Sequence, residues 1–180
     1  MVTNCDVKSF LVLCVACIMY YGATFSFVSQ GQHFLMDGFH LTEDVATNMI
    51  GLVFFASAVV SPLLGFLLDT IGKTITCLLF ALSASGLCHL VLTFAFRGNI
   101  SLEIIWYYLV MVMMGMAYSL VTIAIWPIAS IAFKIPDKML CTAYGLMQAS
   151  LNLGTAVISE AVHTFKTEYE NGTMEVSRVG

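Results

Sequence analysis

Charged side chains are scarce in this sequence. Only 10% of its 180 residues are Asp, Glu, Lys or Arg, whereas about 25% is usual in a soluble domain. No cluster of Lys and Arg occurs, so the sequence has no basic patch that would attract nucleic acid. A water-soluble domain and a nucleic-acid-binding protein are therefore both poor interpretations.

Catalytic and metal-binding patterns are also missing. We find no set of nucleophile, base and acid, no Gly-rich phosphate loop and no spaced group of metal ligands. Cys14 and Cys17 have the spacing of a redox or zinc pair, but they lie in an apolar run without a basic neighbour. We therefore predict no enzymatic activity, no cofactor and no metal, and expect the cysteines to be free thiols.

Long apolar runs make up most of the chain, and 59% of its residues are hydrophobic. Uncharged runs of ~20 residues are long enough to cross a bilayer as helices. The predicted fold class is an all-α, polytopic membrane protein, with the lipid bilayer as its surroundings. A short lead covers residues 1–8, and a polar tail that we expect to be disordered covers 164–180. The five predicted spans cover about residues 9–29, 45–68, 74–96, 102–133 and 139–163.

The first apolar run has a second interpretation. Lys8 precedes it, and the small residues Gly22 and Ala23 follow its most apolar part, as they would in a signal peptide. The run continues beyond the ~7 to 15 residues of a usual signal-peptide core, which favours a membrane span. Cleavage would leave the order of the later spans across the membrane unchanged.

The second span is predicted to begin at Thr42, because Thr is a common N-cap and two acidic residues follow it. Small residues recur every four positions along this span and lead to an acid. They share one helix face, along which another helix can approach closely. The strip consists of Ser57, Ser61, Gly65 and Asp69. Pro62 is expected to bend the helix within it.

A tight turn is predicted between the second and third spans. Asp69, Gly72 and Lys73 place a carboxylate, a glycine and an ammonium group within five residues, between two apolar runs. Charges in such a turn can remain hydrated at the membrane surface. The turn is therefore expected at the point where the chain leaves the bilayer and re-enters it.

The distribution of basic residues indicates an orientation. When the polar segments are assigned alternately to the two sides, four lysines fall on one side: Lys8, Lys73, Lys134 and Lys138. Lys and Arg near span ends favour the cytosolic side. Two glycosylation sequons, at Asn99 and Asn171, fall on the other side. We therefore predict a cytosolic N-terminus and a lumenal or extracellular C-terminus.

The pattern Gly65-x-Leu67-x-Asp69-x-x-Gly72-Lys73 resembles the signature loop of the major facilitator superfamily. In that family the loop joins the second and third helices of each half of the transporter. The resemblance implies that Gly65, Asp69, Gly72 and Lys73 form a cytosolic gate. It also implies that the signature acid meets the start of the eleventh helix, here the beginning of the fifth span.

Longer motifs are similar to the C-terminal half of the lysosomal dipeptide transporters of this superfamily. They are Tyr20-Tyr21, Ser61-Pro62, Trp126-Pro127, Cys141-Thr142-Ala143-Tyr144-Gly145-Leu146-Met147-Gln148 and Asn152-Leu153-Gly154. This resemblance implies that the five spans correspond to helices seven to eleven of a twelve-helix fold. It also implies transport by alternating access, a lysosomal location and a glycosylated single-span accessory partner. The family's first six helices and its last helix have no counterpart, so we expect a fragment that needs a missing N-terminal half.

Polar and aromatic residues on three spans are the predicted substrate-binding residues. On the fifth span they recur at helical spacing, and such a face suits a water-filled cavity better than lipid. Hydroxyl, amide and aromatic groups suit a small polar solute such as a dipeptide. The alternative is that they join helices by hydrogen bonds. The candidates are Tyr20, Tyr21 and Thr24 on the first span, Ser119, Thr122 and Trp126 on the fourth span, and Tyr144, Gln148 and Asn152 on the fifth span.

The third span lacks such a strip, which fits the resemblance because the family's ninth helix lies outside the cavity. Its single ionisable group, His89, is interpreted as a hydrogen-bonded structural residue, with a proton relay as the alternative. The function predicted overall is transport of small polar solutes, most plausibly dipeptides, across the lysosomal membrane. The alternative is a truncated, non-transporting membrane subunit that modulates a full-length partner.

Overall fold

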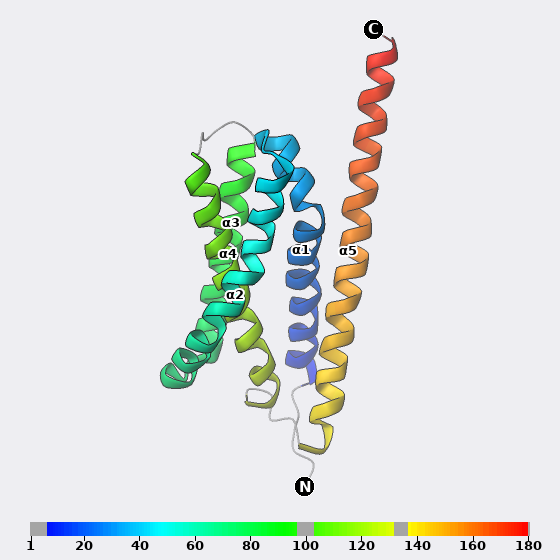
Figure 1. Cartoon of the computed structure of the whole chain (residues 1–180). Helices are drawn as coiled ribbons and strands as arrows, with labels where there is room; N and C mark the ends of the chain where they lie inside the picture. The colour runs from blue at the N-terminus through cyan, green and yellow to red at the C-terminus, as the bar shows by residue number, and fades with distance from the viewer. Residues whose placement is uncertain (1–6, 97–102, 132–136, 180) are drawn as a thin grey trace.

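The chain folds into a bundle of helices. The computed structural model describes residues 7–96, 103–131 and 137–179, and within these ranges every element is an α-helix (Figure 1). In chain order the helices are α1 (Val7–Phe39), α2 (Glu43–Ile71), α3 (Thr74–Phe96), α4 (Ile104–Ile131) and α5 (Asp137–Val179). The predicted all-α fold class is confirmed.

Four of the helices are long and apolar enough to cross a membrane. They are the stretches Lys8–Phe39, Glu43–Ile71, Thr74–Phe96 and Ile104–Ile128. Because Gln148 and Asn152 lower its hydropathy, α5 does not meet the same criterion of composition. α5 nevertheless lies against α1 over the length of the membrane-spanning stretch of α1 (Figure 1). A helix packed along a membrane-spanning neighbour crosses the same layer, so the fifth span is supported by packing.

The helices alternate in direction through this layer. In Figure 1, α1, α3 and α5 run upward, whereas α2 and α4 run downward. The start of α1, the turn between α2 and α3, and the start of α5 therefore lie at one end of the bundle. This arrangement brings Lys8, Lys73 and Lys138 to the same end; Lys134 lies outside the described residues.

The closest helix contacts are made at small residues. A Cβ atom on Gly22 of α1 would lie 2.8 Å from the backbone oxygen of Gly154 on α5. On α4, Gly115 faces the backbone of Val53 on α2 just as closely. Small residues let two backbones approach in this way, which is the usual basis of helix packing in lipid. The most extensive contacts are accordingly those of α1 with α5 and of α2 with α4.

The predicted small-residue strip on α2 forms half of such a contact. Ser57 is buried, and the Ser61 hydroxyl lies 2.7 Å from the Ser119 hydroxyl of α4. A Cβ atom on Gly65, by contrast, would meet nothing within 4 Å. Close approach is therefore confirmed for the first half of the strip, while the half that leads to Asp69 stays open.

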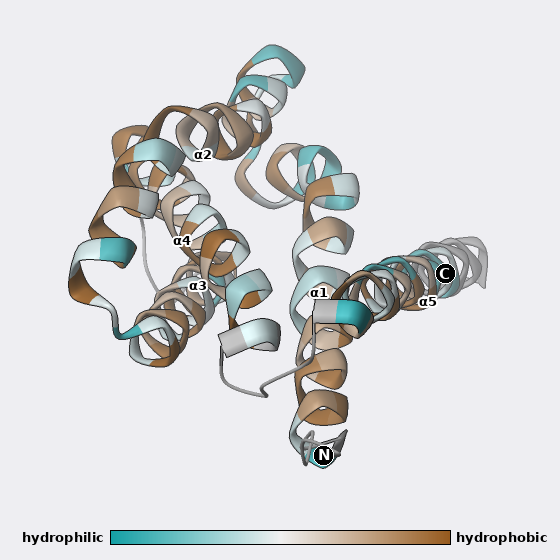
Figure 2. Ribbon diagram, turned by 90° about the horizontal axis from the view of Figure 1, so that it is seen from below, coloured by the Kyte–Doolittle hydropathy of each residue, from teal (hydrophilic) through white to brown (hydrophobic). Residues whose placement is uncertain are grey.

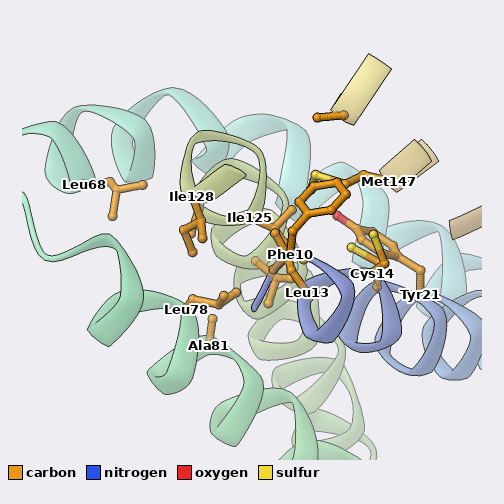
Figure 3. Packing of buried hydrophobic residues seen from close by; sticks show 14 residues of the cluster. Phe10, Leu13, Cys14, Tyr21, Leu68, Leu78, Ala81, Ile125, Ile128 and Met147 are labelled. Atoms are coloured by element: carbon orange, nitrogen blue, oxygen red, sulfur yellow. The ribbon is translucent and has the colours of Figure 1, made fainter. Parts of the chain in front are cut away.

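The buried apolar side chains form two clusters along the bundle. One lies toward the lysine-bearing end and joins α1, α4 and α5 through residues such as Leu13, Ile125 and Met147 (Figure 3). The other joins α2, α3 and α4 toward the opposite end and includes Met49 and Met111. Buried apolar contacts therefore join the helices toward both ends of the bundle.

The outer surface of α2 and α3 is strongly apolar. Phe66 on α2 is 75% exposed, and Phe80 on α3 is 70% exposed. Figure 2 shows hydrophobic colour over most of α2, α3 and α4, whereas α5 is mixed. Large apolar side chains can remain on the outside only where the surroundings are also apolar. This surface therefore faces the hydrocarbon of the bilayer.

Two helices are longer than the sequence predicted. α1 continues to Phe39 through a segment that was expected to be a loop, because its apolar side chains pack on the bundle: Leu35 is fully buried, and Phe34 stacks on Phe96 at 5.0 Å. The expectation of a disordered tail is also wrong, since α5 continues to Val179 and projects beyond the other helices (Figure 1). The tail contains no proline, the residue that most strongly ends a helix.

Candidate functional site

The signature loop is a short turn at the end of α2. Gly72 adopts φ 66°, and its N–H donates to the Leu68 carbonyl at 2.9 Å, which closes the helix. Thr42 occupies the N-cap position at the other end, as predicted, although its side chain makes no capping bond. Asp69 and Lys73 are exposed on either side of the glycine. The predicted tight, hydrated turn is therefore confirmed.

The structure does not bring Asp69 to the start of α5. The two lie on opposite sides of the lysine-bearing end in Figures 1 and 2, because α2 packs on α4 and α5 packs mainly on α1. Among the described residues, Asp69 has no hydrogen bond or ion pair with α5, and Lys138 is likewise exposed. The pairing implied by the family resemblance is absent within this bundle. A gate at Asp69 would need a partner from elsewhere.

Tyr21 lies at the centre of an aromatic group between α1 and α4. Its hydroxyl donates to Oγ1 of Thr122 at 3.4 Å, and its ring is only 2% exposed. Tyr118 of α4 packs edge-on against both Tyr21 and Phe25, with ring centroids 6.3 and 6.2 Å away. Phe54 of α2 meets the same Tyr118 ring at 6.0 Å. This group joins three helices and contains two of the predicted residues.

A second pair of predicted residues joins α4 to α5. The rings of Trp126 and Tyr144 meet edge-on with centroids 5.9 Å apart, and both side chains are half-buried. One turn further along α5, Gln148 is exposed and donates from Nε2 to Oδ1 of Asn152 at 3.4 Å. Asn152 is also exposed. α5 thus presents aromatic and amide groups in succession along one face.

Tyr20 and Thr24 lie in a different environment. The Tyr20 hydroxyl lies close to the side chains of Thr24 and of Ser85 on α3. Thr24 is 2% exposed. Consecutive helix residues are separated by about 100° around the axis, so Tyr20 and Tyr21 necessarily face different neighbours. The Tyr20 hydroxyl therefore lies toward α3, whereas its ring contacts the Tyr21 ring edge-on, with centroids 5.3 Å apart.

Ser119 is part of a helix interface. It is 1% exposed, and its hydroxyl lies 2.7 Å from that of Ser61. Ser61 also donates to the Ser57 carbonyl at 2.7 Å. These contacts fit the alternative interpretation, in which polar residues join helices.

Sequence reasoning missed two aromatic residues of the Tyr21 group, Phe25 and Phe54. Phe25 could have been found, because it lies one helical turn after Tyr21 and shares its face. Phe54 carried no comparable signal, since its position beside α4 depends on how α2 packs. Of the predicted glycosylation sites, Asn99 lies outside the described residues, and Asn171 lies within α5 with its side chain not described. Glycosylation stays a prediction.

A family model identifies the class of protein to which this chain belongs. The family model described as Major Facilitator Superfamily matches residues 10–159. The chain therefore belongs to the Major Facilitator Superfamily, as the signature loop predicted. No solved structure matches it significantly.

Curated relatives narrow the similarity further. Over 158 residues the chain is 37% identical to the mouse (Mus musculus) protein named lysosomal dipeptide transporter MFSD1, which covers 86% of this chain and 32% of that relative. The zebrafish (Danio rerio) protein of the same name is 38% identical over 160 residues, with coverages of 87% and 32%. The human protein is 35% identical over 158 residues, with coverages of 86% and 32%. The chain thus spans under a third of the length of these transporters.

Proposed function

We propose that this chain forms part of a transporter that moves small polar solutes, dipeptides foremost, across the lysosomal membrane by alternating access. Its membership in the Major Facilitator Superfamily supports transport. The printed names of its relatives support the dipeptide and the lysosome. In such transporters two halves rock about a site near the middle of the membrane, and this chain would supply helices of one half.

The observation that carries this proposal is the open amide face of α5. Gln148 and Asn152 are exposed although they lie on a stretch that packs along the membrane-spanning α1. Their one described hydrogen bond is within α5, so they do not join the described helices to each other. Exposed amides in hydrocarbon would be costly. A water-filled cavity between this face and a second set of helices would remove that cost.

The chemistry of this face suits a dipeptide. The amide groups of Gln148 and Asn152 each offer both a donor and an acceptor, as a peptide bond requires. The Trp126 and Tyr144 rings, one to two turns away, can hold an apolar side chain or the ammonium group of the solute. The described side chains of this face are uncharged. Selection would therefore rest on hydrogen bonds and aromatic contact, with any countercharge supplied by the other half.

The partners and orientation of the chain are part of the same proposal. The lysines at one end of the bundle favour a cytosolic position for that end. On this proposal the N-terminus would lie in the cytosol and the C-terminus in the lumen. The signature loop, with Asp69 exposed at that end, would act as a gate against the missing N-terminal half. A glycosylated single-span protein is the proposed accessory partner.

Counterflow of a radiolabelled dipeptide into liposomes tests the proposal. The chain would be reconstituted alone and joined to the N-terminal half of the zebrafish relative. We expect uptake by the joined form. Gln148→Ala should raise the KM about fivefold, because one hydrogen bond to the solute is worth about 1 kcal/mol.

Ser83→Ala is the matched control, since Ser83 is exposed on α3 and bonds only to its own helix; its KM should not change. Absence of dipeptide uptake in both forms would contradict the assigned substrate. Uptake with an unchanged KM in Gln148→Ala would instead remove the α5 face from the binding site.

A further inference from the structure

Polar groups also meet where α1 contacts α3, well inside the membrane-spanning stretches. Tyr20 and Thr24 come from α1, while Ser85 and His89 come from α3. The Phe27 ring lies beside the His89 ring, with centroids 5.3 Å apart, and closes one side of the group. This set, which we call the α1–α3 polar cluster, lies apart from the face proposed to bind solute.

A backbone contact fixes the tautomer of His89. Its Nδ1 lies 2.8 Å from the Ser85 carbonyl oxygen. A carbonyl can only accept a hydrogen bond, so Nδ1 must carry the proton. In a neutral imidazole the other nitrogen, Nε2, is then an acceptor. That Nε2 atom is enclosed and has no hydrogen-bond partner among the described residues.

Tyr20 presents the complementary group. Its hydroxyl is also enclosed and makes no hydrogen bond of acceptable geometry with a described residue, although Ser85 and Thr24 lie beside it. The hydroxyl hydrogen is therefore available as a donor. The contact between α1 and α3 thus encloses a donor, the Tyr20 hydroxyl beside Ser85, and an acceptor, Nε2 of His89, which lies one helical turn after Ser85 on α3.

Among the described residues of α1 to α3, no charged side chain lies within the cluster. The charged groups of α1 to α3 lie near the helix ends, on Lys8, Asp37, Glu43, Asp44, Asp69 and Lys73. An unpaired polar atom inside the membrane is costly, whereas a buried water commonly makes hydrogen bonds to two to four such groups.

We propose that the α1–α3 polar cluster is a binding site for one water molecule, which accepts a hydrogen bond from Tyr20 and donates one to Nε2 of His89. The Ser85 hydroxyl is the nearest third partner. The water links α3 to α1, two helices with few other contacts. This site does not depend on the proposed transport function, and its tests measure no transport.

Thermal unfolding of the intact chain in detergent provides the first test, because the sign of the effect is informative. With a shared water, Tyr20→Phe and His89→Leu each remove one of its partners and should each lower Tm by ~2–4 °C, which corresponds to about 1 kcal/mol. The double variant, with Tyr20→Phe and His89→Leu combined, should be at least as stable as the less stable of the two single variants. Ser83→Ala on the outer face of α3 is the control and should leave Tm unchanged.

Two results would overturn the proposal. A higher Tm for Tyr20→Phe would show that the hydroxyl has no partner, since removing an unpaired buried group stabilises a protein. Additive losses in the double variant would show that the two side chains share no common partner.

Radiolytic labelling gives a second test that does not depend on stability. Hydroxyl radicals formed from bound water oxidise the side chains next to it, so Tyr20 should be oxidised in the intact chain in nanodiscs. His89→Leu should reduce this oxidation to background. Two results would contradict a water held by His89: the absence of Tyr20 oxidation in the unsubstituted chain, and Tyr20 oxidation that persists in His89→Leu.

Discussion

The role of a side chain in this bundle depends on the direction in which it points from its helix. Tyr20 and Tyr21 are consecutive, yet Tyr21 bonds to Thr122 on α4 while Tyr20 faces Ser85 on α3. The two rings are in edge-on contact, with centroids 5.3 Å apart, but their hydroxyls face different helices because about 100° of helix rotation separates the two residues. A pair of adjacent tyrosines on a membrane helix is therefore better treated as two separate hypotheses.

Gly72 is the residue on which the signature loop most directly depends. Its φ of 66° lies in the left-handed region, where a side chain costs roughly 1–2 kcal/mol. We expect Gly72→Ala to lower the free energy of unfolding by about that amount. Thermal unfolding in detergent would measure the change.

Gly72→Asn should lose less stability, because Asn tolerates the same conformation. Gly51→Ala is a suitable control, since Gly51 lies in the same helix with nothing within 4 Å of an added Cβ. Equal stability of Gly72→Ala and Gly51→Ala would show that the left-handed turn is not formed.

Among whole helices, the stable units are the parallel pairs α1 with α5 and α2 with α4. Both pairs meet at glycine and serine, where the backbones approach closely, and large apolar side chains such as Met147 and Met111 are buried beside these contacts. Other large side chains point outward, where lipid solvates them as well as protein would. Helix pairing here depends on close backbone contact.

The sequence predicted the helices well where apolar runs end at charged turns. The end of α2 at Ile71 and the start of α3 at Thr74 follow directly from Asp69 and Lys73. The end of α1 was missed, because Gln30 and Gln32 look like a loop until Leu35 is seen buried in the bundle. Local polarity indicated that the helix ends before this segment, but tertiary packing keeps the segment helical as far as Phe39.

The sequence predicted which helices carry the candidate site residues, but not whether each residue faces a cavity or a neighbouring helix. Spacing correctly grouped Gln148 with Asn152, which are hydrogen-bonded along α5. Spacing could not show that Ser119 faces Ser61 on α2, because that contact depends on which helices become neighbours. Assigning a polar residue to a cavity or to an interface therefore requires the packed bundle.

Gly154 is expected to control the pairing of α1 with α5. A Cβ atom there would lie 2.7 Å from the Ile18 Cα atom, inside van der Waals contact. Gly154→Ala should therefore push the helices apart and cost about 1–3 kcal/mol, as overpacking usually does. The fall in Tm would be measured in detergent.

Gly145→Ala tests the same substitution on the same helix without the contact, because an added Cβ there meets nothing within 4 Å. It should leave Tm unchanged or raise it slightly, since Ala favours helix more than Gly does. A similar Tm for both variants would argue against close packing at Gly154.

For the molecule as a whole, the defining feature is that α1 and α5 run parallel although three helices separate them in the chain. Ile18 meets Gly154, and eight residues later Ser26 meets Ser159, with the two hydroxyl oxygens 2.9 Å apart. Parallel neighbours must enter the membrane from the same side. This contact brings the start of α5 to the same end of the bundle as the start of α1, as the predicted arrangement of five crossings requires.

A disulfide across this pair tests the whole arrangement. Ser26→Cys combined with Ser159→Cys, in a Cys141→Ser background, should form a bond rapidly under mild oxidation, because hydroxyls in contact place the two Cβ atoms within disulfide range. With a protease site inserted at 97–102, the cleaved halves should stay together on a non-reducing gel and separate after reduction. Ser26→Cys with Ser150→Cys is the control, since Ser150 lies more than two turns away along α5 and bonds to its own helix. Crosslinking of the control pair in preference to the Ser159 pair would mean that α5 is displaced or reversed relative to α1, and the five-crossing arrangement would then have to be abandoned.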